Sequence, residues 1–286
     1  MPSLDPRITP ARVDIAAKHL EGKVDAARFV EGAWREVIVP QTSVRRVPSH
    51  DAPLDTEALK GESFIAYDDN GEGWSWGQLL NDGYVGWIPT QSIGRQRDEL
   101  THRVSALRTL AFASASIKLP PVESLPLGSL LAIRRIQGDF GVTATGVYVP
   151  AKHLQQLSVS ATDYVAIAER FVGSPYLWGG KTNIGIDCSG LVQVALTAVG
   201  VTCPRDSDMQ EAALGTRIEL AQDFSNLRRG DLIFWDGHVA IACDAGRLVH
   251  ANAFHMSVVV ELVAEAMQRI GAAGVALKSV RRMGGR

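Results

Sequence analysis

A short helix organises the second half of the chain, and residues 187–200 spell it as Asp-Cys-Ser-Gly-Leu-Val-Gln-Val-Ala-Leu-Thr-Ala-Val-Gly. Asp187 is a favourable N-cap, because its side chain can accept hydrogen bonds from the first backbone N–H groups of a helix. Apolar residues follow at helical spacing from Leu191, and Gly200 is a typical C-terminal stop. The pattern therefore predicts a helix over 188–199 whose first residue is a cysteine.

Two histidines stand on strands that the sequence predicts further along. Residues 231–243 hold two β-rich runs separated by Asp236-Gly237, which is a strong signal for a two-residue hairpin turn. Residues 247–251 follow after a short turn and should form the next antiparallel strand. His238 and His250 belong to neighbouring strands of this pattern, so we expect them to lie close together.

This set of one cysteine and two histidines fits nucleophilic catalysis at an acyl carbon. A helix N-terminus and an adjacent imidazolium lower a thiol pKa from about 8.5 to about 3.5–7.5, so we expect Cys188 to supply thiolate at neutral pH. The reaction also needs a base within hydrogen-bond reach of the sulfur and a third group that holds the base in its useful tautomer. His238 and His250 can fill these two roles, and the backbone N–H of Cys188 can bind the oxyanion.

The C-terminal motifs resemble the NlpC-type family of cell-wall cysteine peptidases, which have a papain-like fold. They stand in unbroken order over residues 160–286 as Pro-Tyr-Leu-Trp-Gly-Gly-Lys, Asp-Cys-Ser-Gly, Pro-Arg-Asp-Ser, Gly-Asp-Leu-Ile-Phe-Trp, His-Val-Ala-Ile and Leu-Val-His-Ala. The resemblance implies that Cys188 is the nucleophile, His238 the general base and His250 the orienting residue. It implies no metal and no cofactor.

The same resemblance implies a set of substrate-binding residues. Asp187 matches an acid that binds the free amine of an N-terminal L-Ala, with Ser189 beside it, while Trp178 and Ser207 match positions that line the same pocket. A carboxylate that holds an ammonium in a closed site would reject substrates with blocked N-termini. From spacing alone, a helix cap explains Asp187 equally well and core packing is an alternative for Trp178. Arg205 is expected only in a local ion pair with the acid that follows it.

The residues upstream read as small β domains. Over residues 34–94, short β-rich runs alternate with Asn-Gly and Asp-Gly turns, and the segment Asp-Gly-Tyr-Val-Gly-Trp-Ile-Pro at 82–89 resembles a bacterial SH3 domain. In relatives whose first such barrel packs on the catalytic domain, a tyrosine at the position of Tyr84 walls the S2 side of the site; an ordinary core aromatic is the alternative. Asp51 and Asp55 are candidates for an acid that helps to bind the amine.

We therefore expect an α+β protein in which a papain-like catalytic domain follows two small SH3-like β-barrels. The expected segments are, in order, a helical lead-in (1–33), a first SH3-like domain (34–94), a second and weaker one (95–155) and the peptidase domain (158–286). The lead-in is expected to be helical because residues 12–31 place apolar side chains among helix-favouring neighbours. Residues 261–273 read as a C-terminal helix.

The composition limits the number of domains, the kinds of partner and the cellular location that we expect. The chain has 286 residues, of which 46% are hydrophobic and 21% charged, so it has room for roughly two average domains, or for one average domain and two small barrels. Its net charge of −2 provides no field that would attract nucleic acid or an anionic membrane. We expect a cytoplasmic location, because no signal-peptide pattern or long apolar run is present. Three cysteines without a C-x-x-C pair argue against a disulfide framework.

The resemblance implies a cysteine peptidase that hydrolyses the γ-D-glutamyl-diamino acid bond of murein peptides during cell-wall peptide recycling. Its partner would be a murein-derived peptide with a free N-terminus, L-Ala-γ-D-Glu-diamino acid, in which meso-diaminopimelate and L-Lys are both open, as is the oligomeric state. Two alternatives are a wall-binding SH3-like scaffold with a degenerate peptidase domain, and an amidase or acyltransferase of the same fold. A zinc site of Cys188, His238 and His250 would require a fourth ligand or water.

Overall fold

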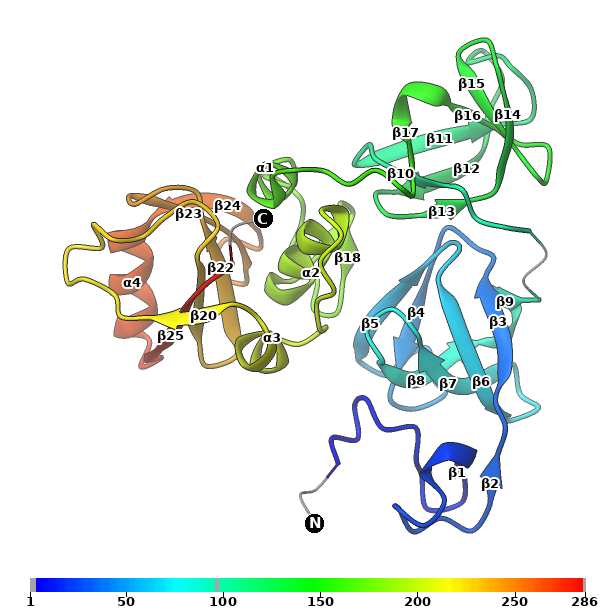
Figure 1. Ribbon diagram of the computed structural model, residues 1–286, viewed down its shortest axis with the longest axis horizontal. Coiled ribbons are helices and arrows are strands. Elements are labelled where there is room, and N and C mark those ends of the chain that lie inside the picture. The colour runs from blue at the N-terminus through cyan, green and yellow to red at the C-terminus, as the bar shows by residue number, and fades with distance from the viewer. Residues whose placement is uncertain (1–3, 96–97, 285–286) are drawn as a thin grey trace. The chain divides into compact units, whose positions relative to one another are not determined.

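The chain divides after Val159 into two units, and the computed structural model describes residues 4–95 and 98–284. The first unit consists of β-strands and short turns, and the second combines an antiparallel sheet with helices (Figure 1). This agrees with the α+β class expected from the sequence. Cys188, His238 and His250 all belong to the second unit. None of the helices in the described ranges is long and apolar enough to cross a membrane.

One antiparallel sheet forms the centre of the second unit, with the strand order β20-β25-β21-β22-β23-β24. A two-residue turn joins β21 to β22 and pairs Trp235 with His238, and Gly237 in this turn has the left-handed backbone (φ 68°) that favours glycine. The predicted hairpin and the strand that follows it are therefore confirmed. The strands are β20 (Thr216–Ile218), β21 (Leu232–Trp235), β22 (His238–Ala242), β23 (Arg247–Asn252), β24 (Ser257–Leu262) and β25 (Leu277–Arg282).

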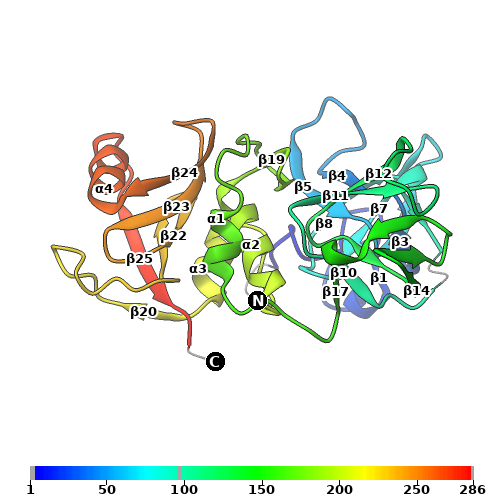
Figure 2. The same cartoon turned by 90° about the horizontal axis from the view of Figure 1, so that it is seen from above.

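Helices cover both faces of this sheet (Figure 2). On one face, α4 packs Val263, Ala266 and Ile270 against sheet residues that include Ile233 and Ala240. On the other face, α1 and α2 contact β23, and α2 also contacts β22. The helices are α1 (Tyr164–Glu169), α2 (Cys188–Ala198), α3 (Ser207–Ala213) and α4 (Val263–Ala272), and the short strands β18 (Lys181–Thr182) and β19 (Gly185–Ile186) precede α2.

The sequence predicts helices at the positions of α1, α2 and α4, and the bounds of the last two can be compared directly. The helix predicted over 188–199 is confirmed as α2, which begins at the predicted cysteine. The C-terminal helix begins later than predicted, because Glu261 and Leu262 still belong to β24. In that strand Glu261 pairs with Leu248 of β23. The ladder hydrogen bonds with β23 therefore hold Glu261 in extended backbone.

The first unit contains a sheet with the strand order β5-β4-β8-β7-β6-β3-β9. Its strands close around an apolar core of Val37, Val44, Ala58, Phe64, Leu79, Tyr84, Ile88 and Ile93. The alternation of β-rich runs and turns predicted for this region is confirmed. The elements are β3 (Ala33–Val37), β4 (Gln41–Arg45), β5 (Leu54–Leu59), β6 (Ser63–Asp69), β7 (Trp74–Leu79), β8 (Val85–Pro89), the 3-10 turn η2 (Thr90–Ser92) and β9 (Ile93–Gly94).

The lead-in before this sheet is not the predicted helix. It forms β1 (Ala16–Ala17), a 3-10 turn η1 (Lys18–Leu20) and β2 (Phe29–Val30), and β1 pairs with β2 in parallel. Ile15 and both residues of β1 are fully buried, and three consecutive residues cannot all face a core from one side of an α-helix. Ile15 packs with the tryptophans Trp74, Trp76 and Trp87. Packing on these aromatic rings therefore overrides the local helix propensity.

A second β unit follows, with two small sheets around a core of its own. The sheets run β13-β10-β17 and β12-β11-β16-β15-β14. Strands thus occur in the region predicted as a second barrel, and its likeness to an SH3 domain stays a prediction. The elements are β10 (His102–Val104), β11 (Arg108–Phe112), β12 (Pro121–Pro126), β13 (Leu130–Leu131), β14 (Ile133–Gln137), β15 (Phe140–Thr143), β16 (Tyr148–Pro150), the 3-10 turn η3 (Ala151–His153) and β17 (Leu154–Gln156).

Candidate active site

Cys188 is the first residue of α2, and Asp187 caps that helix. Oδ1 of Asp187 accepts a hydrogen bond from the N–H of Gly190 at 2.7 Å, as expected of an N-cap. Cys188 is buried, and the backbone of Val239 forms a hydrogen bond with its thiol. Because Val239 directly follows His238, this contact brings the cysteine to the beginning of β22.

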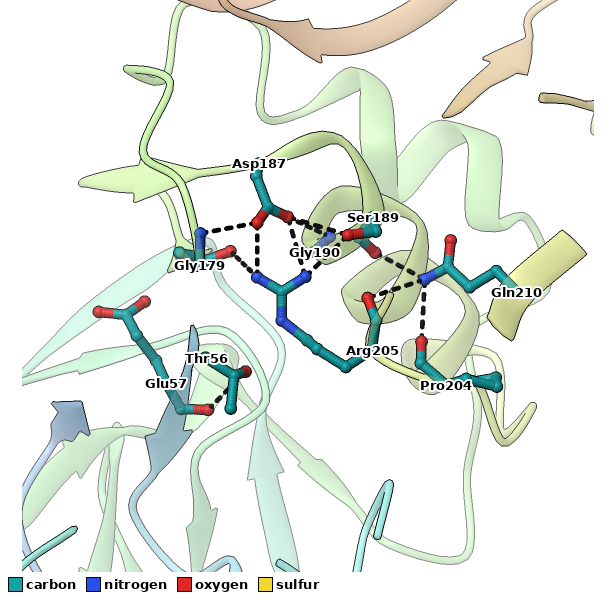
Figure 3. Close-up of polar contacts among 10 residues, drawn as sticks. Thr56, Glu57, Gly179, Asp187, Ser189, Gly190, Pro204, Arg205 and Gln210 are labelled. Atoms are coloured by element: carbon teal, nitrogen blue, oxygen red, sulfur yellow. Dashed lines mark hydrogen bonds and ion pairs between the residues drawn. The ribbon is translucent and has the colours of Figure 1, made fainter. Parts of the chain in front are cut away.

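Asp187 also has a buried countercharge, Arg205, which is only 1% exposed. The guanidinium donates from Nη1 to Oδ1 at 3.0 Å and from Nη2 to Oδ2 at 2.7 Å, which is a bidentate pair (Figure 3). The N–H of Gly179 donates to Oδ2 at 2.7 Å, and Nη1 of Arg205 also donates to Oγ of Ser189 at 2.8 Å. A network of charge-assisted hydrogen bonds therefore surrounds the start of α2.

The buried role of Arg205 was not expected from the sequence, which assigned it only a local ion pair. The two charged residues stand 18 positions apart, so no local pattern indicates that they meet. The physical reason for the pairing is burial. A carboxylate that is removed from water requires hydrogen bonds and an opposite charge, and the planar guanidinium fork supplies both.

His238 and His250 lie diagonally across two neighbouring strands. The register pairs Ala242 with Leu248, which directs both histidines to the same face of the sheet. Nε2 of His238 lies 2.9 Å from Nδ1 of His250, and His250 is fully buried. The predicted proximity of the two histidines is confirmed. Since Nε2 of His238 contacts His250, Nδ1 is the nitrogen of His238 that can accept a proton from another group.

Both imidazoles are neutral at pH 7. Burial, followed by the proximity of His250, lowers the pKa of His238 to about 3. Burial also lowers the pKa of His250 to about 4, although its hydrogen bond to Glu261 acts in the opposite direction. A neutral imidazole can accept a proton, as a general base must.

The thiol of Cys188 is neutral as well. Burial raises its pKa to about 12, and the negative charge of Asp187 adds to the rise, while Val239 and Arg205 act the other way. We expected the helix N-terminus to lower the pKa of the Cys188 thiol, and this expectation is wrong, because the pKa is raised. The acid that caps the helix places negative charge near the sulfur, and burial disfavours the thiolate. The resting site thus holds a neutral thiol and a neutral imidazole, and the proton must leave the sulfur as attack occurs.

Sequence reasoning missed one residue behind the histidine pair. Glu261 of β24 places Oε2 at 2.9 Å from Nε2 of His250, and Arg269 of α4 donates to the same oxygen at 2.7 Å. The helix predicted from residue 261 concealed this contact. Within residues 4–95 and 98–284, no group of three or more His, Cys, Asp or Glu side chains is arranged to hold a metal ion. The geometry gives no support to the zinc site considered from the sequence.

The predicted binding residues of the second unit differ in exposure. Trp178 is 66% exposed, so the alternative of core packing is wrong for this ring. Ser189 is buried within the Asp187 network, and Ser207 is the half-buried first residue of α3. Gln210 of α3 donates to the carbonyl of Ser189 at 2.9 Å, which links α3 to α2. Substrate contact by Asp187 and these residues stays a prediction.

The other predicted binding residues belong to the first unit. Tyr84 is 4% exposed and packs in the core of the first sheet. Tyr84 and Asp55 also line a cavity of about 670 Å³ together with Trp76, and Nη2 of Arg46 lies 3.7 Å from Oδ1 of Asp55. The role of Tyr84 at the S2 side and an amine-binding role for Asp55 or Asp51 stay predictions.

Comparisons with known proteins match both parts of the chain. Residues 173–270 match the NlpC/P60 family, and residues 44–93 match the bacterial dipeptidyl-peptidase Sh3 domain. A Bacillus cereus protein named gamma-D-glutamyl-L-lysine dipeptidyl-peptidase is 26% identical over 247 residues, which cover 72% of this chain and 69% of that protein. A Bacillus subtilis protein of the same name is 26% identical over 229 residues, covering 70% of this chain and 73% of that protein.

A solved structure extends the similarity to the fold. The crystal structure of an NlpC/P60 family protein from Bacillus cereus aligns with a TM-score of 0.74 at 18% sequence identity. The alignment covers 87% of this chain and 99% of that chain. At this identity the likeness concerns the fold, which agrees with the papain-like architecture expected from the motifs.

Proposed function

Because the chain carries an NlpC/P60 domain at residues 173–270 and a bacterial SH3 domain at residues 44–93, we propose that it is a cysteine peptidase acting on murein peptides. The bond cleaved is the one between γ-D-Glu and the diamino acid, in peptides with a free N-terminal L-Ala. Two relatives carry the name of such a dipeptidyl-peptidase. The observation that carries the proposal is the 2.9 Å contact between His238 and His250, on the strands packed against the helix that Cys188 begins.

In the first step, the sulfur of Cys188 attacks the γ-carbonyl carbon of D-Glu while Nδ1 of His238 takes the thiol proton. The resulting imidazolium keeps its Nε2–H directed at His250. The negative charge that develops on the carbonyl oxygen lies near the start of α2, where the backbone N–H of Cys188 can donate to it. The C–N bond then breaks, and His238 returns the proton to the departing amine of the diamino acid.

In the second step, water releases the dipeptide from the enzyme. His238, neutral again, takes a proton from water as the oxygen attacks the thioester carbon. The C–S bond breaks, the thiolate of Cys188 recovers the proton from His238, and L-Ala-γ-D-Glu leaves. The elevated pKa of the thiol favours this recovery, because the sulfur holds its proton firmly in the resting site.

Recognition of the free amine is assigned to Asp187, assisted by Ser189. Asp187 already accepts hydrogen bonds from Arg205 and from the N–H groups of Gly179 and Gly190. An ammonium would therefore share this carboxylate with Arg205. Trp178, with two thirds of its surface exposed, is assigned to the pocket wall together with Ser207.

Mass spectrometry of reaction products tests the proposal. The protein is incubated with L-Ala-γ-D-Glu-meso-diaminopimelate and L-Ala-γ-D-Glu-L-Lys, each in free and N-acetylated form. We expect L-Ala-γ-D-Glu to be released from a free peptide, no cleavage of the acetylated peptides, and no product from Cys188→Ala. Cys203→Ala is the matched control, because it removes another buried cysteine thiol that lies outside the proposed catalytic set and should keep activity.

Each other outcome changes the proposal in a defined way. Cleavage of both free and acetylated peptides would keep the peptidase and remove the amine requirement. Transfer of the acyl group to an added amine would indicate an acyltransferase. Retention on insoluble murein without cleavage by folded, reduced protein would favour the wall-binding scaffold. Fractionation of the producing cells tests the cytoplasmic location that belongs to this proposal.

A further inference from the structure

An acidic side chain lies directly behind the histidine pair. β23 and β24 pair His250 with Val259 and Leu248 with Glu261, so Glu261 is the diagonal neighbour of His250 on the same face of the sheet. Oε2 of Glu261 lies 2.9 Å from Nε2 of His250. The second ring nitrogen of His250 therefore faces a carboxylate, while the first faces His238.

Arg269 of α4 holds that carboxylate in place. It donates from Nε to Oε1 at 3.1 Å and from Nη2 to Oε2 at 2.7 Å. Its guanidinium also lies 4.6 Å from the ring centre of Phe254, which restricts it further. Burial acts to raise the pKa of Glu261, but hydrogen bonds from Arg269 and His250 outweigh it, and the pKa lies below its usual value. The side chain is thus a fixed carboxylate, 11% exposed.

A fixed carboxylate decides which nitrogen of His250 carries the proton. An anionic acceptor at 2.9 Å requires N–H at Nε2, because a lone pair there would face negative charge. Neutral His250 then has a lone pair at Nδ1, which accepts the Nε2–H of His238. The ring of His238 is left with its lone pair at Nδ1, the form in which it can take a proton.

We propose that Glu261, held by Arg269, is a positioning residue that sets the protons of both imidazoles in the order that makes His238 a base. This inference rests on the proposed function, in which His238 takes the proton of Cys188. In a catalytic triad, a buried acid contacts the catalytic base directly and orients it. Here Glu261 contacts His250, and His250 in turn contacts His238, so the acid orients the base through one intervening histidine. Its effect is transmitted through two hydrogen bonds rather than by contact with the substrate.

A neighbouring amide presents the competing arrangement. Nδ2 of Asn252 lies 3.0 Å from the same Nε2 of His250, and Oδ1 of Asn252 accepts the N–H of His255 at 2.8 Å, which fixes the amide orientation. If Nε2 of His250 accepted the N–H of Asn252, His250 would carry its proton at Nδ1 and donate it to Nε2 of His238. The proton of His238 would then sit at Nδ1, and this nitrogen could not act as a base. The charge of Glu261 favours the productive order over this one.

Kinetics and imidazole NMR together test the inference. The variants are Glu261→Ala, Glu261→Gln and the matched control Glu265→Gln, an exposed acid in the first turn of α4. We expect Glu261→Ala to lower kcat on the order of 10- to 100-fold with little change in KM, which is below the full contribution of a general base. Glu261→Gln should recover part of the loss because its carbonyl can accept the Nε2–H, and Glu265→Gln should keep full activity.

The spectroscopic readout separates positioning from mere stability. In protein labelled with 15N-histidine, wild-type His250 should be protonated at Nε2 and unprotonated at Nδ1, and His238 should show the same pattern. The Glu261→Ala variant should lose this single pattern while melting as a folded protein. If His250 carries its proton at Nδ1 in the wild type, or if Glu261→Ala leaves kcat and both ring patterns unchanged, the inference is overturned.

Failure of this inference can be distinguished from failure of the proposed function. The ring pattern needs no substrate, so a wild-type protein with the expected tautomers and no peptidase activity would overturn only the proposed function. A wild-type protein that cleaves the murein peptide with the reverse tautomers would overturn only the role of Glu261. Should Glu261→Ala not fold, the wild-type pattern and the isosteric Glu261→Gln variant still decide the question.

Discussion

Replacement of Arg205 by methionine would remove the buried countercharge of Asp187 while keeping most of the side-chain volume. Arg205 is 1% exposed and donates two hydrogen bonds to the carboxylate and one to Ser189. Loss of one partner of a buried pair costs about 3–5 kcal/mol, because the other charge stays buried without compensation. The N–H groups of Gly179 and Gly190 still hold Asp187, so we expect the lower end, about 3 kcal/mol.

Hydrogen exchange in increasing urea, read by mass spectrometry on peptides from α2, measures the free energy of unfolding of the second unit alone. Arg247→Met is the control, since Arg247 makes a similar contact with Asp244 at 2.7 Å on the exposed surface and should have far less effect. The double variant Asp187→Asn with Arg205→Met should recover about 1–2 kcal/mol of the loss, because it removes the stranded charge. A loss below about 1 kcal/mol in Arg205→Met would refute the buried-charge reasoning.

Three further predictions concern the reactive residues and their support. Acidification from about pH 7 to about pH 5 should lower the free energy of unfolding of the second unit, which a urea titration measures. In the folded state the pKa values of His238 (about 3) and His250 (about 4) lie below the unfolded value near 6.5. The unfolded chain therefore takes up protons in this range that the folded chain does not, and unfolding becomes easier. The loss is on the order of 1 kcal/mol per pH unit for each histidine, and His250→Gln should halve it. Alkylation of Cys188 by iodoacetamide, followed by peptide mass spectrometry, should rise steadily from about pH 6 to about pH 9, and a constant rate would contradict the raised thiol pKa. Arg269→Met should lower kcat by about threefold to tenfold in steady-state kinetics, less than loss of Glu261 itself, and an unchanged kcat would show that Glu261 needs no support.

The elements that carry the reactive groups were predictable because their signals are local. A capping acid and apolar spacing indicate α2, and an Asp-Gly pair between β-rich runs indicates the hairpin that places His238 at the start of β22. The next short turn, over residues 243–247, sets the register of β22 and β23 and brings His250 next to β22. Each of these features depends on residues close together in the chain.

The wrong predictions concern residues whose state depends on distant partners. The lead-in has helix-favouring residues, yet Ile15 packs against tryptophans that stand far away along the chain, in the first sheet. Glu261 has neighbours typical of a helix start, yet its pairing with β23 keeps it in a strand. In both places a long-range contact outweighed local propensity, which contributes only tenths of a kcal/mol per residue.

The sequence by itself determined the order of the reactive residues, the helix that Cys188 begins and the strands that bear His238 and His250. Only the tertiary structure decided the electrostatic state of these groups. Arg205 reaches Asp187 from 18 positions away, Glu261 reaches His250 across a strand pair, and burial sets the neutral forms of thiol and imidazole. The physical reason is that hydrogen-bond periodicity and turns are properties of neighbouring residues, whereas desolvation and charge pairing arise only when distant segments pack together.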